Sequence, residues 1–575
     1  MKRLKFIALG LSLLLMVSLS ITIKNAACQI PEEQKLSFEI LTPEYDPVRV
    51  RIGDLMVEWF KEIGVKLVNK PVDFSTLIDS VYNTFDFHLY IIETAAQFEP
   101  WYLSAYYVSW EDRPGGNNPW GLHNDTYDTL AKEVATAVDP EERREILFEM
   151  QQILAEQVPI IPLYCRDWMQ AYRSDRIKDV VGMAGGVLNF WTFITMTTRA
   201  TPGHGTVTVA MMDYVKNFNP LKEETWYDWF FNLVIYDRLF QVDVDLSLKP
   251  WICKEWSVSA DGLTWTFKIH NNVTWHDGTP LTVHDLNFTI WFVKENEVPA
   301  WYSAVMYVKK TEILDDYTIK ITLNQTDAWF LRKFGTFIIL PKHIWEGLAW
   351  DTPEPPEIVG CGPFRLVDRK EGEWIKMERH TEYFKSGYPR IDTLIYKVVS
   401  SPEAQYLALK TGEVDIMCWT LPYGVIKEAV EHPDITPAPY PDTYYGIIGF
   451  NLRDQRLGDV NVRRALAHAI DKETIVNLLM LGWAAPVYTY VHHNYTEWCN
   501  FDIPRYEFNL TRANEILDKA GYIDVDGDGI RELPGVSPPP KPIPVWIWAT
   551  VAAAVIAIVA IIAAVYYVKK AKPAT

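Results

Sequence analysis

The sequence predicts an α/β protein of at least two domains, with an export signal at the amino end and a transmembrane helix at the carboxyl end. Strand-like stretches alternate with helical stretches along the body, an apolar run occupies each end, and 575 residues are more than one hydrophobic core usually organises. Hydrophobic residues make up 49% and charged residues 22% of the chain, a balance typical of a folded protein rather than a disordered one.

The amino terminus has the three parts of a secretory signal peptide, which we predict over residues 1–27. Three basic residues among the first five precede the apolar run 6–23, and Ala26 and Ala27 offer small side chains for cleavage. Cys28 follows directly, so lipid modification of this cysteine is an alternative.

The carboxyl end predicts a membrane anchor. A Pro-rich stalk at 536–544 precedes an uncharged apolar run at 545–568, which as a helix would span about 36 Å, enough for a hydrocarbon core of about 30 Å. The tail 569–575 is rich in lysine, so the positive-inside rule places it in the cytoplasm and the body outside.

The body opens with a strand–helix–strand pattern. Residues 36–41 alternate with period two, residues 48–63 carry apolar side chains at helical spacing, and residues 65–68 form a second strand-like stretch. This βαβ unit predicts a parallel pairing in at least one lobe.

Local signals place the remaining elements. Asp139 is a suitable N-cap and Pro140 suits a first helical position, so a helix is expected over 140–157. The other predicted elements are strands at 206–210 and 317–323, a hairpin at 256–269 that turns at Asp261 and Gly262, and helices at 459–479 and 512–520.

Composition restricts the partners. The formal net charge of −19 argues against nucleic acid, which requires a basic surface. The 23 Trp and 30 Tyr are either core or a stacking surface for a ligand. Six N-x-S/T triplets are consistent with an extracellular glycoprotein: Asn124, Asn272, Asn287, Asn324, Asn494 and Asn509.

Four ordered motifs resemble the family 5 extracellular solute-binding proteins of ABC importers, whose members include oligopeptide, dipeptide and nickel receptors. They are CKEWSVSADGLTWTFKIHNNVTWHDGTPLTVHDLNFTI at 253–290, VGCGPF at 359–364, DVNVRRALAHAID at 459–471 and LDKAGYIDVDGDGIREL at 517–533. The resemblance implies a periplasmic-binding-protein-like fold of type II, with two lobes and an extra small subdomain.

The order of the motifs departs from the family pattern. RREILFEMQQILAEQVPIIPLY at 143–164 resembles the family's carboxy-terminal portion, yet it precedes the others here. We therefore expect a circularly permuted chain, with one lobe built from 36–164 and 443–535 and the other from 165–442. The expected hinge segments are 164–167 and 439–445.

The resemblance implies a membrane-anchored, extracytoplasmic receptor that passes a small organic ligand to importer permease subunits and is not an enzyme. Oligosaccharides and oligopeptides are both candidate ligands. The alternatives are a cell-surface glycan hydrolase and a sensor or adhesion protein that kept the fold. The sequence contains no nucleophile elbow, HExxH motif or P-loop that would favour an enzyme.

Family peptide receptors hold the ligand's ammonium group with an aspartate, and here alanine stands at the matching place, with Glu93 two or three positions away. Without an acid, burying an ammonium costs several kcal/mol, so a neutral sugar becomes a serious candidate ligand. Ligand contacts are expected from these residues: Glu224, Thr225, Trp226, Phe74, Glu93, Trp301, Tyr302, Trp101 and Trp419.

Two motifs suggest metals. Asp524, Asp526 and Asp528 resemble the start of a calcium loop, although position twelve is Gly535 rather than glutamate, so an acidic turn is the alternative. The pair His492–His493 is expected in a solvent-exposed turn, with metal ligation as the alternative.

Overall fold

The computed structural model describes residues 30–95, 100–200 and 204–539, together with scattered positions between 550 and 565. The predicted signal peptide and the tail 569–575 lie outside the described residues, as does most of the apolar run 545–568. Among the described residues, no helix is both long and apolar enough to cross a membrane.

In the described residues, twelve strands form one sheet that runs through both lobes. Ten of them follow one another across it: β14 (Phe364–Lys370), β15 (Trp374–Arg379), β16 (Thr393–Val398), β7 (Thr206–Met211), β17 (Ile416–Met417), β4 (Ile160–Arg173), β19 (Tyr444–Phe450), β3 (Leu89–Ala95), β1 (Ser37–Pro43) and β2 (Lys66–Val72). The other two, β18 (Ile435–Pro441) and β20 (Ala484–Pro486), pair with β4.

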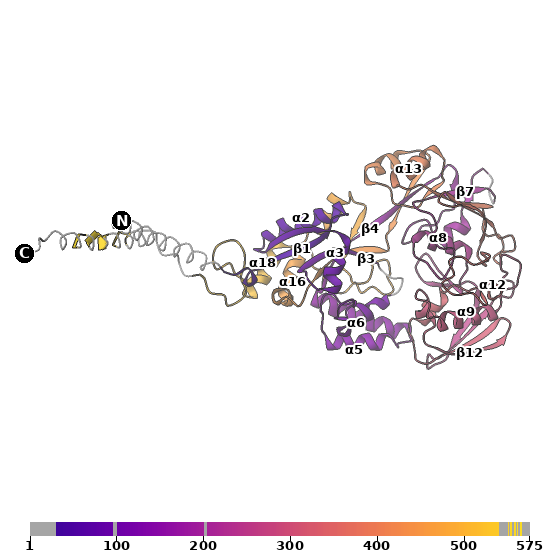
Figure 1. The fold of residues 1–575 in the computed structure, drawn as a ribbon, viewed down its shortest axis with the longest axis horizontal. Coiled ribbons are helices and arrows are strands. Elements are labelled where there is room, and N and C mark those ends of the chain that lie inside the picture. The colour runs from indigo at the N-terminus through magenta and orange to yellow at the C-terminus, as the bar shows by residue number, and fades with distance from the viewer. Residues whose placement is uncertain are drawn as a thin grey trace, which may run out of the picture.

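The first lobe combines segments from both ends of the chain. Its core packs β1, β3 and α2 (Pro47–Lys61) with α16 (Val460–His468) and α18 (Leu510–Lys519). Figure 1 shows this mixture by colour, with the early β1 and α2 beside the late α16 and α18. β1 and β2 pair in parallel, so the predicted βαβ unit is confirmed.

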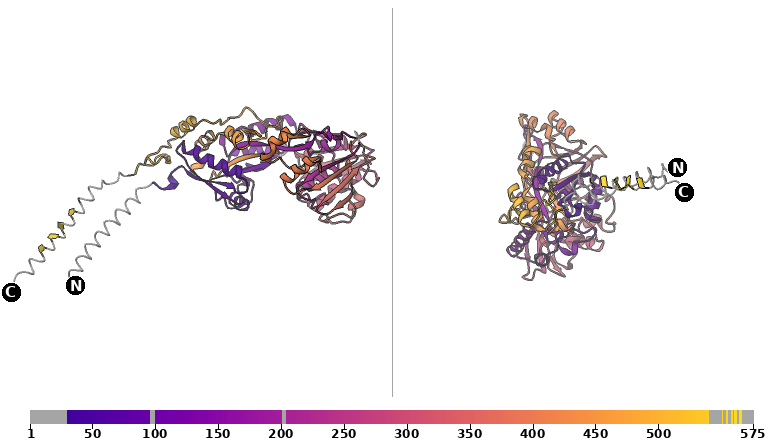
Figure 2. Two further views of the ribbon diagram at one scale, coloured as in Figure 1. Left: turned by 90° about the horizontal axis from the view of Figure 1, so that it is seen from above. Right: turned by 90° about the vertical axis from the view of Figure 1, so that its left-hand side faces the viewer.

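The second lobe is formed by the intervening chain, and its main core draws on residues 177–438. It includes α8 (Trp226–Ile235), α9 (Val283–Glu295) and a four-stranded sheet of β10 (Cys253–Val258), β11 (Thr264–Ile269), β13 (Thr318–Leu323) and β12 (Val308–Asp315). Figure 2 shows the two lobes side by side. The predicted hairpin is β10–β11, with Gly262 at φ 68° in its turn.

Local sequence signals gave accurate bounds where capping decides them. α6 covers Pro140–Gln157 as predicted, and the Asp139 carboxylate accepts hydrogen bonds from the first-turn amides. The region 459–479 contains α16, α17 (Lys472–Thr474) and a five-residue π-helical turn at Ile475–Leu479.

The five cysteines among the described residues are all buried, and none forms a disulfide: Cys165, Cys253, Cys361, Cys418 and Cys499.

The chain crosses between the lobes twice, once along β4 and once along the consecutive strands β18 and β19, which run antiparallel to β4. β4 pairs with β19 in the first lobe and with β18 in the second. Between β18 and β19, the Asp442 amide donates to the Arg166 carbonyl at 2.8 Å. The two expected hinge segments therefore lie side by side at the boundary of the lobes.

A second contact joins the lobes away from these strands. Arg143 of α6 donates to the carbonyl of Ala328, and its guanidinium lies 4.9 Å from the ring centroid of Trp329 in the second lobe and 5.3 Å from that of Trp498 in the first. Arg143 thus connects the lobes opposite the crossing strands.

Candidate functional site

A cavity of about 690 Å³ lies between the lobes beside the crossing strands. This volume falls within the usual range for a small-molecule site. β3 and the segment before β19 supply residues from the first-lobe side, while α8 and the segment after β17 supply residues from the second. We call this cavity the cleft.

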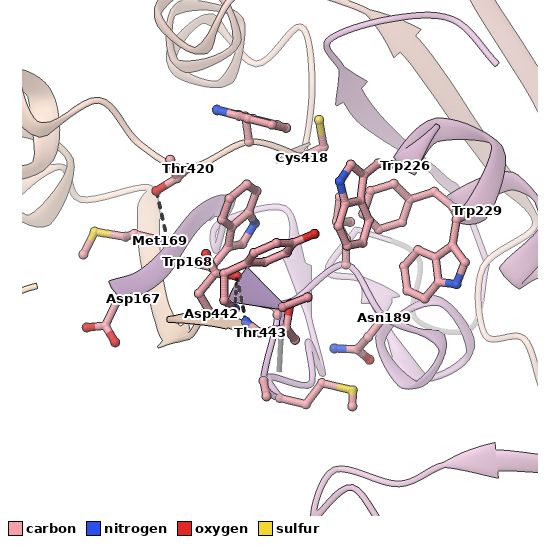
Figure 3. Close-up of a pocket in the computed structure, with 18 of the residues that line it drawn as sticks. Asp167, Trp168, Met169, Asn189, Trp226, Trp229, Cys418, Thr420, Asp442 and Thr443 are labelled. Carbon is pink, nitrogen blue, oxygen red and sulfur yellow. Dashed lines mark hydrogen bonds between the residues drawn. The ribbon is translucent and has the colours of Figure 1, made fainter. Parts of the chain in front are cut away.

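Aromatic side chains form two groups in the cleft. Trp168 of β4 and Trp419 meet edge to face, with ring centroids 5.0 Å apart. Trp226 and Trp229 of α8 do the same at 6.0 Å. Figure 3 shows Trp168 facing Trp226 and Trp229 across the cavity, with Asp442 and Thr443 beside Trp168. Such rings can stack on a sugar or on a flat side chain.

The position of Trp226 follows from the helix start. Thr225 is the N-cap of α8, its hydroxyl accepts from the Asp228 amide, and the Asp228 carboxylate accepts from the Thr225 amide, a complete capping box. The helix therefore begins at Trp226, whose side chain is left 51% exposed at the cleft.

Charged groups surround the hinge end of the cleft. Arg166 forms an ion pair with Glu93 and contacts Asp46 at 3.4 Å, and Asp46 also pairs with Arg49 at 2.8 Å. Burial opposes the charge of Arg166, but Glu93, Tyr164 and Asp46 together outweigh burial and raise the pKa of Arg166 above its ordinary value. Burial, helped by the charge of Glu93, raises the pKa of Asp442 to about 6.

The other end of the cleft, within the second lobe, carries positive charge. Arg238 and Arg332 line it together with Gln241 and Thr336. Arg238 lies three residues after the end of α8, and Arg332 belongs to α11 (Phe330–Gly335). The Arg332 guanidinium donates to the Leu246 carbonyl at 3.0 Å.

Three of the predicted contact residues line the cleft: Glu93, Trp226 and Trp419. The cleft lining does not include the other six: Glu224, Thr225, Phe74, Trp301, Tyr302 and Trp101. Thr225 is used as a helix cap, and the Trp301 indole donates to the Pro220 carbonyl at 3.3 Å while packing against Phe337. Phe74 is exposed against Tyr45, and Trp101 packs on Tyr106.

Sequence reasoning missed Trp168, Trp229, Asp442 and Arg238. A usable signal existed for Trp168, because Arg166, Trp168 and Gln170 alternate along one strand and share a face. Arg238 gave no such signal, since its exposure to the cleft depends on packing between α8, α11 and β8 (Phe240–Val242).

The acidic loop gathers around a lysine. The carboxylates of Asp524, Asp526, Asp528 and Glu532 lie within 4.8 Å of one another. The Lys35 ammonium contacts Asp526 at 2.7 Å, Asp528 at 2.5 Å and Glu532 at 3.4 Å. Burial would lower the pKa of Lys35, but hydrogen bonds with these acids raise it above the ordinary value. The donor set suits calcium, yet this ammonium already supplies a cation.

The prediction that His492 and His493 lie in a solvent-exposed turn is wrong for His492. His492 is 1% exposed, its Nε2 lies 3.0 Å from the Sγ of Cys165, and its ring stacks on His493. Burial lowers the pKa of His492 to about 3, so the ring is neutral at ordinary pH.

Residues 247–565 match the family model described as bacterial extracellular solute-binding proteins, family 5 middle. The match covers more than half of the chain. The chain belongs to this family. Its relatives are named as binding proteins and not as enzymes.

Two curated relatives illustrate the similarity of this family 5 protein. The oligopeptide-binding protein AppA of Bacillus subtilis is 29% identical over 312 residues, which cover 52% of this chain and 56% of AppA. The glutathione-binding protein GsiB of Pectobacterium atrosepticum is 26% identical over 293 residues, 50% of this chain and 55% of GsiB. The chain thus matches little more than half the length of these relatives.

Solved structures are also similar. NikA from Brucella suis in complex with Fe(III)-EDTA has a TM-score of 0.47 and 21% identity, covering 58% of this chain and 68% of NikA. AppA from Bacillus subtilis in complex with a nonapeptide has a TM-score of 0.42 and 24% identity, covering 58% of this chain and 67% of that chain.

Proposed function

We propose that this family 5 protein is the extracytoplasmic receptor of an ABC importer, which captures an organic ligand in the cleft and delivers it to permease subunits. The observation that carries the proposal is the aromatic cavity between two lobes joined by paired crossing strands. Such a hinge lets the lobes close on a ligand. The apolar run 545–568 would hold the receptor to the membrane.

The geometry favours an oligosaccharide over a peptide recognised by its free amino terminus. Glu93 is the acid nearest in sequence to the alanine that stands in place of the ammonium-binding aspartate, and Arg166 forms an ion pair with it. A ligand ammonium would have to displace that guanidinium. The rings of Trp168, Trp226 and Trp419 offer stacking surfaces that sugars use.

We also infer that the chain is circularly permuted. The motif order supports this, and so does a first lobe that combines residues 36–164 with residues 443–535. A permuted chain shares only one continuous stretch with its relatives in the same order, which would account for matches over about half of each protein.

We propose that the acidic loop can bind calcium only when Lys35 leaves it. Calcium would be held by Asp524, Asp526, Asp528 and Glu532, but only after Lys35 had moved away. With Lys35 in place, we propose that the ammonium holds the loop against the start of β1.

A fluorescence titration tests the proposed function. The full-length chain in detergent is titrated with short oligosaccharides and, separately, with short peptides while tryptophan emission is recorded. Saturable quenching by a sugar supports the oligosaccharide receptor, and a response to peptides alone assigns the ligand to that class. No response to either, combined with release of reducing ends from glycans, would replace the receptor by the hydrolase alternative.

A further inference from the structure

Arg238 is a buried cation that faces the cleft without an ionic partner. It is 9% exposed and lines the second-lobe end of the cavity. Within the described parts of the chain, its guanidinium makes no side-chain hydrogen bond, and no carboxylate oxygen lies within ion-pair distance; its Nε is fully buried and unbonded. A buried charged side chain normally has an oppositely charged partner.

The two acids that influence Arg238 electrostatically are bound elsewhere. Asp237 accepts from the Tyr383 hydroxyl at 2.6 Å and from the Gln241 amide at 3.2 Å. Glu223 accepts from the Asn232 amide at 3.0 Å. Burial raises the pKa of Asp237 to about 7 and also raises that of Glu223. Neither acid neutralises the guanidinium at contact distance.

The charges along the cleft are unevenly distributed. Arg238 and Arg332 lie at the second-lobe end, whereas Asp167 and Asp442 lie at the hinge end, where Arg166 is already paired with Glu93. A bound molecule therefore meets positive charge at one end and acidic oxygens at the other.

We propose that the second-lobe end of the cleft binds a carboxylate group of the ligand, with Arg238 as its ionic partner. This deepens the proposed function and rests on it. A guanidinium presents parallel N–H donors that match a carboxylate, and the surrounding protein strengthens the pairing by excluding water. The carboxylate belongs either to a uronic acid residue of an oligosaccharide or to the carboxyl terminus of a peptide.

Calorimetry of the full-length chain with matched probes tests the proposal. One pair is a neutral trisaccharide and the same trisaccharide ending in a uronic acid; the other is a tripeptide and its carboxy-terminal amide. In whichever pair binds, the acid should bind about 10- to 100-fold more tightly, as expected for a charged hydrogen-bonded contact. Equal affinity, or tighter binding of the neutral probe, would overturn the carboxylate assignment but leave the receptor function intact.

Variants locate the effect. Arg238→Gln should remove the preference for the acidic probe, and Arg238→Lys should keep part of it. The control is Arg365→Gln, which removes an arginine that is half exposed on the same lobe and pairs with Glu378 at 3.6 Å outside the cleft. If Arg238→Gln does not fold, the paired probes on the natural chain still decide the question. No binding of any probe would count against the receptor function and the carboxylate assignment together.

Discussion

Arg166 and Arg238 both line the cleft and both are largely withdrawn from water, yet their surroundings differ. Arg166 lies between Glu93 and Asp46 on the strands that join the lobes. Arg238 has no acid at contact distance among the described residues. We infer that Arg166 stabilises the hinge end of the cleft, whereas Arg238 is available to pair with the ligand.

The largest expected effect comes from breaking the paired arginine. Arg166→Gln leaves Glu93 and Asp46 with like charges and one cation fewer, so the free energy of unfolding should fall by about 2–3 kcal/mol, less than for a fully buried pair because the Arg166 side chain is 26% exposed. Denaturant unfolding measures the loss. The double variant Glu93→Gln with Arg166→Gln should recover part of it, and a single variant as stable as the natural chain would refute the structural role.

Lys35, like Arg166, is a cation paired with several acids. Lys35→Ala removes the cation from a cluster of four carboxylates and should lower the free energy of unfolding by about 2 kcal/mol. Millimolar calcium should restore the melting temperature of this variant, whereas a chelator should leave the natural chain unchanged. A natural chain that a chelator destabilises would show that calcium, rather than Lys35, holds the loop.

Lys472 tests whether an unpaired buried cation by itself marks a ligand site. It is 4% exposed, lies outside the cleft, and donates to the Val487 carbonyl at 2.9 Å. Burial lowers its pKa to about 7 from an ordinary 10.5. The ammonium also lies 4.2 Å from the ring centroid of Tyr488. Lys472→Met should stabilise the fold by about 1–2 kcal/mol, since the desolvation cost outweighs the lost hydrogen bond and the lost cation–π contact. Ligand affinity should not change.

The pH dependence of Lys472 has a definite sign. Between pH 7 and 10.5 the unfolded chain holds a proton on this lysine that the folded chain lacks, so stability rises with pH across this range. The gain from Lys472→Met should therefore be largest at or below pH 7 and vanish near pH 10.5. The exposed Lys519→Met is the control, and a gain independent of pH would contradict this assignment.

The smallest expected effect is on ligand affinity, from removing the contact that Arg143 makes between the lobes. It joins the lobes through Ala328 and Trp329, so Arg143→Ala should favour the open state and weaken ligand binding about 3- to 10-fold. Calorimetry measures the change. The neighbouring Arg144→Ala, which removes only a pair with Glu141 on the same helix, should leave the affinity unchanged. Equal effects of both variants would argue against a role of this contact in closure.

The sequence could predict what short stretches determine. α6 was placed because Asp139 and Pro140 act within one turn, and the β1–α2–β2 unit was placed because its periodicities are local. Contacts between distant segments could not be predicted in this way: Lys35 meets Asp526 in the acidic loop, and Arg166 meets Glu93 at the cleft. The isolation of Arg238 depends on where Tyr383 and Asn232 direct the neighbouring acids, which no local pattern reveals.

The same limit explains the aromatic predictions. Trp226 and Trp301 both occur in polar stretches, yet Trp226 faces the cleft while Trp301 is used to pack against Phe337. Residue type indicated that some rings would line a cleft. The tertiary arrangement decided which ones.

The most direct test of the cleft as the binding site compares two exposed tryptophans. Trp226 lines the cleft and is 51% exposed, whereas Trp256 lies outside it, 42% exposed, and packs on Phe240. With a ligand identified by the fluorescence titration, calorimetry should show that Trp226→Ala weakens binding at least about 10-fold, in line with the loss of one aromatic stacking partner, while Trp256→Ala has no effect. Equal affinities for the two variants would contradict binding between the lobes.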